Sequence, residues 1–203
     1  MSLLKEAEQL CLKAYQSINP GRSIEDIYWD VQGFWEFQDY NLWIVFRGSS
    51  SRRDWLINLS ASKLIYPYGD GNSKVKIHSG FCKAYLSVRK EIHNLVRLWA
   101  GTHDIIFTGH SLGGAIATIA AVDCEYNFNI NPKLITFAQP KVGNRAYAES
   151  IDRRVPDYQR LCNVYDPVPH LPWGRYCHGG KLSHIARFCP NPHEIKGYNQ
   201  ICP

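Results

Sequence analysis

The sequence predicts an α/β protein with a mostly parallel central sheet that is flanked by helices. From residue 104 onward, short apolar runs alternate with helical patterns, which is typical of parallel strands joined by crossover helices. Upstream, the run Leu42–Phe46 is continuously apolar, as expected of a strand buried on both faces. A length of 203 residues with 45% hydrophobic residues suits one domain over residues 1–203.

The period of the apolar residues predicts the elements in order. Residues 2–17 place apolar side chains on one helical face, and residues 24–46 have strand texture around a turn expected near Gln32-Gly33. The later elements are a strand at 75–78, a helix at 81–100, a strand at 105–107, a helix at 111–123, a strand at 133–137, a helix at 144–154 and a strand at 160–165. Catalytic groups in such sheets gather at the carboxyl ends of the strands.

Charge and composition exclude several classes of protein. Lys and Arg outnumber Asp and Glu by 23 to 18, a mild excess without the dense basic stripe of a nucleic-acid binder. The excess suits ordinary solubility charge better than an anionic lipid surface. No apolar run is long enough for a transmembrane helix. Charged residues interrupt any signal-peptide pattern at the N-terminus, so the chain is expected to be intracellular, or secreted with its signal removed.

The seven cysteines do not predict a metal site. Four of them lie in apolar stretches and are expected to be small buried side chains: Cys11, Cys82, Cys124 and Cys162. The other three, between which one disulfide is conceivable, lie in the C-terminal quarter: Cys177, Cys189 and Cys202. No pair has Cys-x-x-Cys spacing, so we expect no zinc, and nothing in the sequence calls for another cofactor.

A Gly-x-Ser-x-Gly pattern carries the candidate nucleophile, Ser111. Gly109 and Gly113 surround this serine between an apolar strand and a helix rich in small residues, the context of a nucleophile elbow in the α/β-hydrolase fold. The elbow exposes the serine Oγ above the sheet edge, and the helix N-terminus directs N–H groups toward a developing oxyanion. The alternative is a glycine-rich helix entry with a capping serine.

The partners of the nucleophile are sought downstream, because the chain order in this fold is Ser, then Asp or Glu, then His. Asp166 directly follows a predicted strand. We expect the three other downstream aspartates to be solvated carboxylates: Asp123, Asp152 and Asp157. Among the histidines, His193 follows the breaker run 189–192 and suits a loop-borne base, whereas His170 lies in a Pro-rich turn and is expected to be structural.

By these motifs the chain resembles the class 3 lipase family, which comprises fungal-type triacylglycerol lipases and their plant and microbial relatives. The matching segments, in family order, are 46–49 with 54–59, 78–81, 108–114, 137–144 and 163–172. The resemblance implies a triad of Ser111, Asp166 and His193. It also implies an oxyanion hole made by Ser49 (backbone N–H and hydroxyl) and the Leu112 backbone N–H. His78, Pro140, Gly143 and His178 match structural positions of the family.

The chain departs from the fungal pattern in two ways. The stretch from Asp166 to His193 is much shorter, which keeps His184 and His178 as alternative bases. The disulfide-forming cysteines of the fungal enzymes are missing.

The resemblance also implies a lid over residues 50–60. This segment combines basic and apolar side chains, as suits a lipid–water interface: Arg52, Arg53, Trp55, Leu56 and Ile57. A surface helix docked permanently on the core is the alternative. The implied function is hydrolysis of acylglycerol-type esters through an acyl-enzyme, without metal or cofactor. A phospholipase A1, a soluble-ester (feruloyl-type) esterase and a non-catalytic binding module on the same fold stay as alternatives, and the sequence leaves the oligomeric state open.

Overall fold

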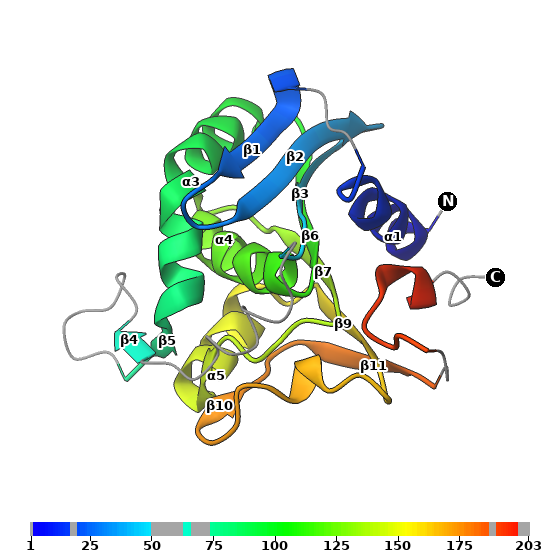
Figure 1. Ribbon diagram of the computed structural model, residues 1–203. Helices are drawn as coiled ribbons and strands as arrows, with labels where there is room; N and C mark the ends of the chain where they lie inside the picture. Colours follow the sequence, from blue (N-terminus) through cyan, green and yellow to red (C-terminus); the bar gives the residue numbers. More distant parts are fainter. Residues whose placement is uncertain (1, 17–19, 50–62, 66–73, 187–189, 199–203) are drawn as a thin grey trace.

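The computed structural model describes residues 2–16, 20–49, 63–65, 74–186 and 190–198. Within these ranges the main sheet has the strand order β1-β2-β3-β6-β7-β9-β11 (Figure 1). The strands are β1 (Ser23–Asp26), β2 (Val31–Gln38), β3 (Asn41–Phe46), β6 (Asp104–His110), β7 (Lys133–Phe137), β9 (Tyr158–Asn163) and β11 (Lys181–Ile185). The pairings β1·β2 and β2·β3 are antiparallel and every later pairing is parallel, which confirms the predicted mostly parallel sheet.

Helices cover both faces of this sheet, as Figure 1 shows. One face packs against α1 (Leu3–Lys13) and the C-terminal 3-10 turn η3 (Ile195–Tyr198). The other packs against α3 (Ser79–Trp99), α4 (Leu112–Phe128) and α5 (Arg145–Arg154). The predicted flanking helices are therefore present on both sides of the sheet.

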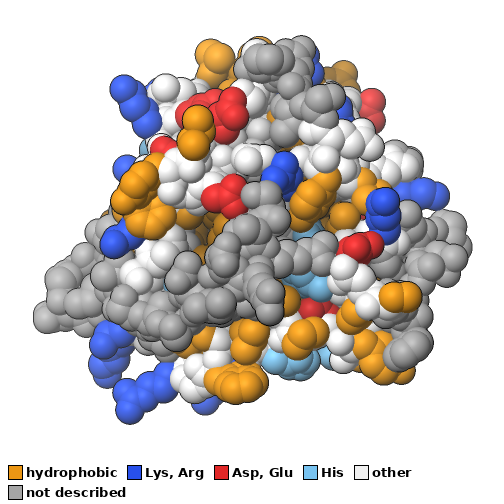
Figure 2. All heavy atoms as spheres, viewed as in Figure 1, with side chains coloured by type: hydrophobic (Ala, Val, Ile, Leu, Met, Phe, Trp, Pro, Cys, Tyr) orange, Lys and Arg blue, Asp and Glu red, His pale blue; other side chains and the backbone are white. Residues whose placement is uncertain are grey.

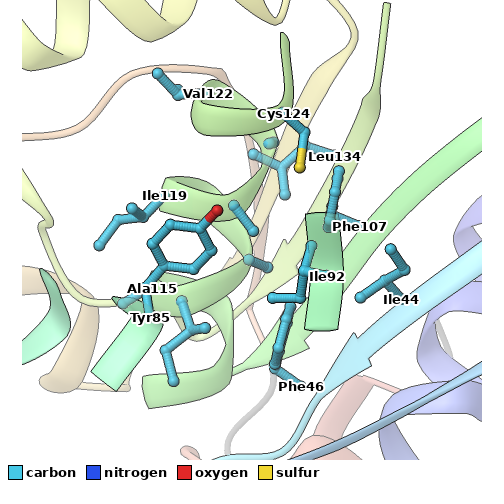
Figure 3. Close-up of a cluster of buried hydrophobic side chains, with 14 of the residues drawn as sticks. Ile44, Phe46, Tyr85, Ile92, Phe107, Ala115, Ile119, Val122, Cys124 and Leu134 are labelled. Carbon is cyan, nitrogen blue, oxygen red and sulfur yellow. The ribbon is translucent and has the colours of Figure 1, made fainter. Parts of the chain in front are cut away.

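The continuous apolar run of β3 follows from burial on both faces. Alternate side chains of a strand point to opposite faces, so Leu42, Ile44 and Phe46 enter the core under α3 and α4. Figure 3 shows Ile44 and Phe46 in this core. Trp43 and Val45 enter the core under α1. All five are fully buried, and each contributes about 2 kcal/mol of apolar transfer free energy.

A second, smaller sheet lies near α5 with the order β10-β8-β5-β4. Its strands are β4 (Lys63–Ile65), β5 (Lys76–His78), β8 (Gly143–Asn144) and β10 (Tyr176–Cys177). The 3-10 turns η1 (Pro20–Arg22) and η2 (Val168–His170) complete the regular elements of the described chain. On the face of the molecule that Figure 2 shows, Lys and Arg are scattered among acidic and apolar side chains of the described residues.

The turn predicted near Gln32-Gly33 is wrong, because both residues lie inside β2. The chain reverses instead at residues 27–30 and at Asp39, and Asp30 and Asp39 adopt left-handed φ values of 50° and 52°. A Cβ on Gly33 would lie 2.3 Å from the Val45 carbonyl oxygen of the neighbouring strand. The glycine therefore permits close strand contact and does not mark a turn.

Several predicted boundaries shift by a few residues. The first helix ends at Lys13, and α3 begins at Ser79 because the ring of His78 caps it, with Nδ1 accepting the Gly80 N–H at 3.1 Å. The elbow helix continues to Phe128, and β9 covers residues 158–163. The short strands β10 and β11 were not predicted.

The cysteine prediction is confirmed for the four apolar stretches. The side chains concerned are at most 6% exposed: Cys11, Cys82, Cys124 and Cys162. Cys177 is half-buried with a free thiol, while Cys189 and Cys202 lie outside the described residues.

Candidate active site

Ser111 occupies a strained turn between β6 and α4. Its φ of 57° and ψ of −123° are rare for a residue with a side chain, and such conformations persist only where the surroundings hold them. Its N–H donates to the Phe137 carbonyl at 2.9 Å, which ties the turn to β7. The residue directly follows the carboxyl end of β6, as the position of the motif between a strand and a helix predicted.

Two glycines make this turn possible. A Cβ on Gly109 would lie 2.4 Å from the Gly113 carbonyl, and a Cβ on Gly113 would lie 2.2 Å from the Phe46 carbonyl oxygen. Both contacts involve backbone atoms, which cannot move aside. The Gly-x-Ser-x-Gly spacing is thus a steric requirement of this turn.

The structure brings Ser111, His193 and Asp166 into one hydrogen-bonded row. His193 Nε2 lies 2.9 Å from Ser111 Oγ, and His193 Nδ1 lies 2.7 Å from Asp166 Oδ2. A carboxylate can only accept, so Nδ1 carries a proton, and in the neutral ring Nε2 is then the acceptor for the Ser111 hydroxyl. All three residues are at most 8% exposed, which shields these contacts from water.

A backbone hydrogen bond orients the Asp166 carboxylate. Oδ1 accepts the Val168 N–H at 2.9 Å, which leaves Oδ2 for His193. The residue follows β9 by three positions, at the carboxyl end of that strand.

The segment that carries His193 is anchored on both sides. Upstream, the Asn163 side-chain amide reaches the Pro192 carbonyl at 3.5 Å. Downstream, Tyr198 is fully buried against Phe137, and its hydroxyl accepts the Asn163 N–H at 3.2 Å. The loop after the breaker run is therefore held against β9 and β7.

The other downstream histidines form no hydrogen bond with Ser111 or Asp166. His184 lies exposed on the edge strand β11, and the side chain of His170 is exposed as well. His178 is largely buried and donates from Nε2 to the Pro169 carbonyl at 2.7 Å. Burial, helped by the positive charge of Arg160, lowers the pKa of His178 to about 3, so this ring is neutral at physiological pH.

Of the positions implied for the oxyanion hole, Leu112 directly follows Ser111, and Ser49 follows Gly48, on which a Cβ would lie 3.1 Å from Ser111 Cβ. Leu112 is the first residue of α4, where backbone N–H groups have no acceptor within the helix. The Ser49 hydroxyl donates to Asp30 Oδ2 at 2.6 Å, a contact that the sequence did not indicate.

Asp123 corrects the prediction of a solvated carboxylate. It is fully buried in α4 and accepts from Arg89 Nε at 2.8 Å and from His93 Nε2 at 2.6 Å. Tyr85 also donates its hydroxyl to this carboxylate, and Asn127 Nδ2 does so at 2.9 Å. One face of α3 carries a polar side chain every four residues: Tyr85, Arg89 and His93. In the sequence, this spacing was the feature that indicated a buried acidic partner.

Two residues beside the site were not predicted from the sequence. His110 is the variable residue of the elbow motif, and its ring is 2% exposed beside His193. Tyr15, just after α1, contacts that ring. A pattern read along the chain could not pair residues 95 positions apart.

The predicted lid, residues 50–60 with Arg52, Arg53, Trp55, Leu56 and Ile57, lies outside the described residues and stays a prediction. Among the helices that are described, none has the length and apolar character needed to cross a membrane.

Comparisons with known proteins agree with this geometry. Residues 43–176 match the family model for lipase (class 3). A lipase of Rhizomucor miehei is 38% identical over 138 residues, covering 64% of this chain and 37% of the relative. A chloroplastic phospholipase A(1), DAD1, of Arabidopsis thaliana is 33% identical over 147 residues, covering 64% of this chain and 33% of the relative. The chain thus spans about a third of the length of these curated relatives.

Solved structures extend the likeness over most of the chain. The Rhizomucor miehei lipase–propeptide complex superposes with a TM-score of 0.79 at 26% identity, covering 94% of this chain and 71% of that one. A triacylglycerol lipase described as having a serine protease triad at its catalytic centre superposes with a TM-score of 0.81 at 28% identity. The match covers 94% of this chain and 84% of that one. These structures confirm the α/β-hydrolase fold, and the family model covers well over half of the sequence. The chain belongs to the class 3 lipase family.

Proposed function

We propose that this protein hydrolyses carboxylic esters of acylglycerol-type lipids, with Ser111 as nucleophile, His193 as general base and Asp166 as the residue that orients the base. The row of hydrogen bonds from Asp166 through His193 to Ser111 carries the proposal. A hydroxyl, an imidazole and a buried carboxylate in this order form the arrangement that activates a serine for acyl transfer.

The reaction would proceed in two steps. His193 Nε2 takes the Ser111 proton as Oγ attacks the ester carbonyl carbon, and the imidazolium then gives that proton to the departing alcohol oxygen. The acyl-enzyme is left on Ser111. In the second step His193 takes a proton from water, the resulting hydroxide attacks the acyl carbon, and the proton returns to Ser111 as the acid leaves. Neither step needs a metal or cofactor.

The oxyanion of each tetrahedral intermediate would be held by the N–H of Leu112 and by Ser49. The N-terminus of α4 adds its positive dipole end at this position. A hydroxyl has one proton to donate, so the Ser49 hydroxyl would have to leave Asp30 Oδ2 in order to donate to the oxyanion.

Support for a lipid ester as substrate comes from the relatives: the Rhizomucor miehei protein is a lipase, and the solved neighbours include triacylglycerol lipases. The Arabidopsis relative is a phospholipase A(1), so hydrolysis of a phospholipid acyl ester is the second candidate. A soluble-ester (feruloyl-type) esterase is a third.

A substrate panel separates these candidates. Nitrophenyl esters of increasing chain length are assayed below and above micelle formation, beside emulsified triacylglycerol, phosphatidylcholine vesicles and a feruloyl ester, with Ser111→Ala as the control. We expect release of fatty acid from triacylglycerol and greater activity on aggregated than on monomeric esters. Release from phosphatidylcholine alone would select the phospholipase, and activity confined to soluble esters would select the esterase.

The segment 50–60 enters the proposal as a lid at a lipid–water interface. Its support is the composition of Arg52, Arg53 and Trp55 with their apolar neighbours. Replacement of Trp55 by Ala should lower the response to aggregated substrate more than the turnover of a short soluble ester.

A further inference from the structure

We propose that Tyr15 and His110 are positioning residues that hold the base His193 and residues 47–49 in register with Ser111, which makes the turn after α1 part of the active site. This inference rests on the proposed function, because it concerns how the same nucleophile and base are aligned.

Three hydrogen bonds join the two sides of the site. His110 Nε2 lies 2.7 Å from the backbone carbonyl oxygen of His193. The other ring nitrogen, His110 Nδ1, lies 2.7 Å from the Tyr15 hydroxyl. That hydroxyl in turn accepts the backbone N–H of Gly48 at 3.1 Å. Gly48 directly precedes Ser49, the proposed oxyanion donor. The Tyr15 hydroxyl therefore connects this part of the chain, through His110, to the segment that carries His193.

The chemistry of the groups sets one direction for this row. A carbonyl oxygen can only accept, so Nε2 of His110 is the protonated nitrogen. In the neutral ring Nδ1 is then an acceptor, and the Tyr15 hydroxyl donates to it. The hydroxyl oxygen is thereby available to accept from Gly48, and every group in the row has the role that its neighbour requires. Hydrogen bonds aligned in this way polarise one another in a buried setting.

The surroundings hold Tyr15 in place. A Cβ on Gly48 would lie 2.5 Å from the Tyr15 hydroxyl, so any larger residue there would displace it. The Arg47 guanidinium lies 5.5 Å from the centroid of the Tyr15 ring, within the range of a cation–π contact. The ring itself meets His110 edge-on at a centroid distance of 5.8 Å.

The position of His193 explains why such a row would affect catalysis. Its ring is held by Asp166 and its backbone by His110, so two anchors fix the angle at which Nε2 meets Ser111 Oγ. The rings of His110 and His193 also lie 4.9 Å apart. Misplacement of a reacting group by about 1 Å can cost on the order of a hundredfold in rate.

A small pocket lies beside Tyr15 and His110. Its volume is about 330 Å³, and its lining includes Tyr15, His110, Ile195 and Lys196. The Tyr15 side chain is 39% exposed, although its hydroxyl points inward. Substitution of this hydroxyl therefore removes polar contacts without opening the core.

The test compares four single variants and the double variant Tyr15→Phe/His110→Leu with the wild type on a short soluble nitrophenyl ester. Tyr15→Phe removes the hydroxyl, His110→Leu removes both ring nitrogens, and His110→Gln restores an N–H donor near the His193 carbonyl. Tyr85→Phe is the matched control, since its buried hydroxyl binds Asp123 in the α3–α4 layer. For each protein, kcat, KM, melting temperature and the rate of Ser111 labelling by a fluorophosphonate are measured.

We expect Tyr15→Phe to lower kcat about tenfold and His110→Leu about a hundredfold, with KM within about twofold of wild type. His110→Gln should recover at least half of the decrease in log kcat that His110→Leu causes. The double variant Tyr15→Phe/His110→Leu should lose less than the product of the single losses, because both residues act through one row. Labelling rates should fall in parallel with kcat, whereas Tyr85→Phe should lower the melting temperature and keep kcat.

The positioning role is overturned if Tyr15→Phe keeps kcat within twofold of wild type. It is also overturned if kcat in His110→Gln is as low as in His110→Leu, or if Tyr85→Phe, through its lower melting temperature, loses as much kcat as Tyr15→Phe. If His110→Leu does not fold, Tyr15→Phe and His110→Gln decide the matter. A wild-type protein that neither turns over esters nor labels at Ser111 would instead refute the proposed function, and with it the base that the row positions.

Discussion

The Nδ1 atom of His193 lies 2.7 Å from Oδ2 of Asp166, although the two residues are 27 positions apart and belong to different segments. Because a backbone N–H from Val168 holds the other carboxylate oxygen, the aspartate presents a single oxygen to the ring. This contact selects the tautomer in which Nε2 faces Ser111 as a base. Its removal should therefore affect the reaction more than the fold.

Replacing Asp166 with Asn should lower kcat on the order of ten thousandfold, because an amide N–H favours the wrong tautomer of His193. The fold should persist, since Asn has nearly the same shape. Turnover of a short ester and the melting temperature check both parts. Asp157→Asn is the control, as that side chain is exposed and should tolerate the change. Activity near wild type in Asp166→Asn would remove the carboxylate from the mechanism.

Removal of the Ser49 hydroxyl should lower kcat about a hundredfold, the usual loss for one oxyanion donor. This expectation requires the hydroxyl to turn from Asp30 toward the reacting ester. Ser87→Ala in α3, whose hydroxyl bonds the Ala84 carbonyl, should leave kcat unchanged. If Ser49→Ala also keeps full activity, the hydroxyl stays with Asp30 and backbone N–H groups alone form the hole.

Stability should fall as the pH drops from about 6.5 toward 3, because of His178. Its pKa is lowered from 6.5 to about 3 by burial, so in this window the unfolded chain binds a proton that the folded chain does not. The free energy of unfolding therefore rises with pH across the window, by up to about 1.4 kcal/mol per pH unit from this residue alone.

The measurement for His178 is the free energy of unfolding against pH. The slope should be reduced in His178→Gln, which can still donate to the Pro169 carbonyl, and kept in His184→Gln, whose side chain is exposed. Equal slopes in wild type and His178→Gln would show that this ring is not the group that titrates.

Asp123→Ala should destabilise the protein by about 3 kcal/mol, because it removes the buried acceptor that Arg89, His93 and Tyr85 share. Asp104→Ala is a matched control: its carboxylate is 65% exposed and pairs with Lys133, so less than about 1 kcal/mol should be lost. Denaturant unfolding compares the two. Similar losses would mean that the Asp123 cluster contributes no more than a surface ion pair.

Local sequence patterns predicted most of the fold and part of the site. The elbow could be recognised because its glycines meet a steric demand within a few residues, as the Gly109–Gly113 contact shows. Asp166 could be placed because parallel strands end at one edge of the sheet. His193 depended on the breaker run before it and on the family resemblance, since spacing alone left His178 and His184 as alternatives.

The remaining features depend on packing between distant segments. Asp123 lies in the part of α4 that is buried on every side, residues 112–124, so no polar face marked it as unusual until α3 supplied its donors. Gly33 was predicted to mark a turn, because the local sequence does not show that it packs against the Val45 carbonyl of the neighbouring strand. The contact between Tyr15 and His110 joins the chain across 95 residues, beyond the reach of any local pattern.

The activation of the Ser111 nucleophile by His193 is tested by mass-spectrometric mapping of a fluorophosphonate adduct on the folded wild-type protein and on His193→Ala. We expect a single adduct at Ser111 in the wild type and a labelling rate lower by several orders of magnitude in His193→Ala, because triad members act as a unit. An adduct on another serine, or equal labelling of the two proteins, would contradict the activation of Ser111 by His193.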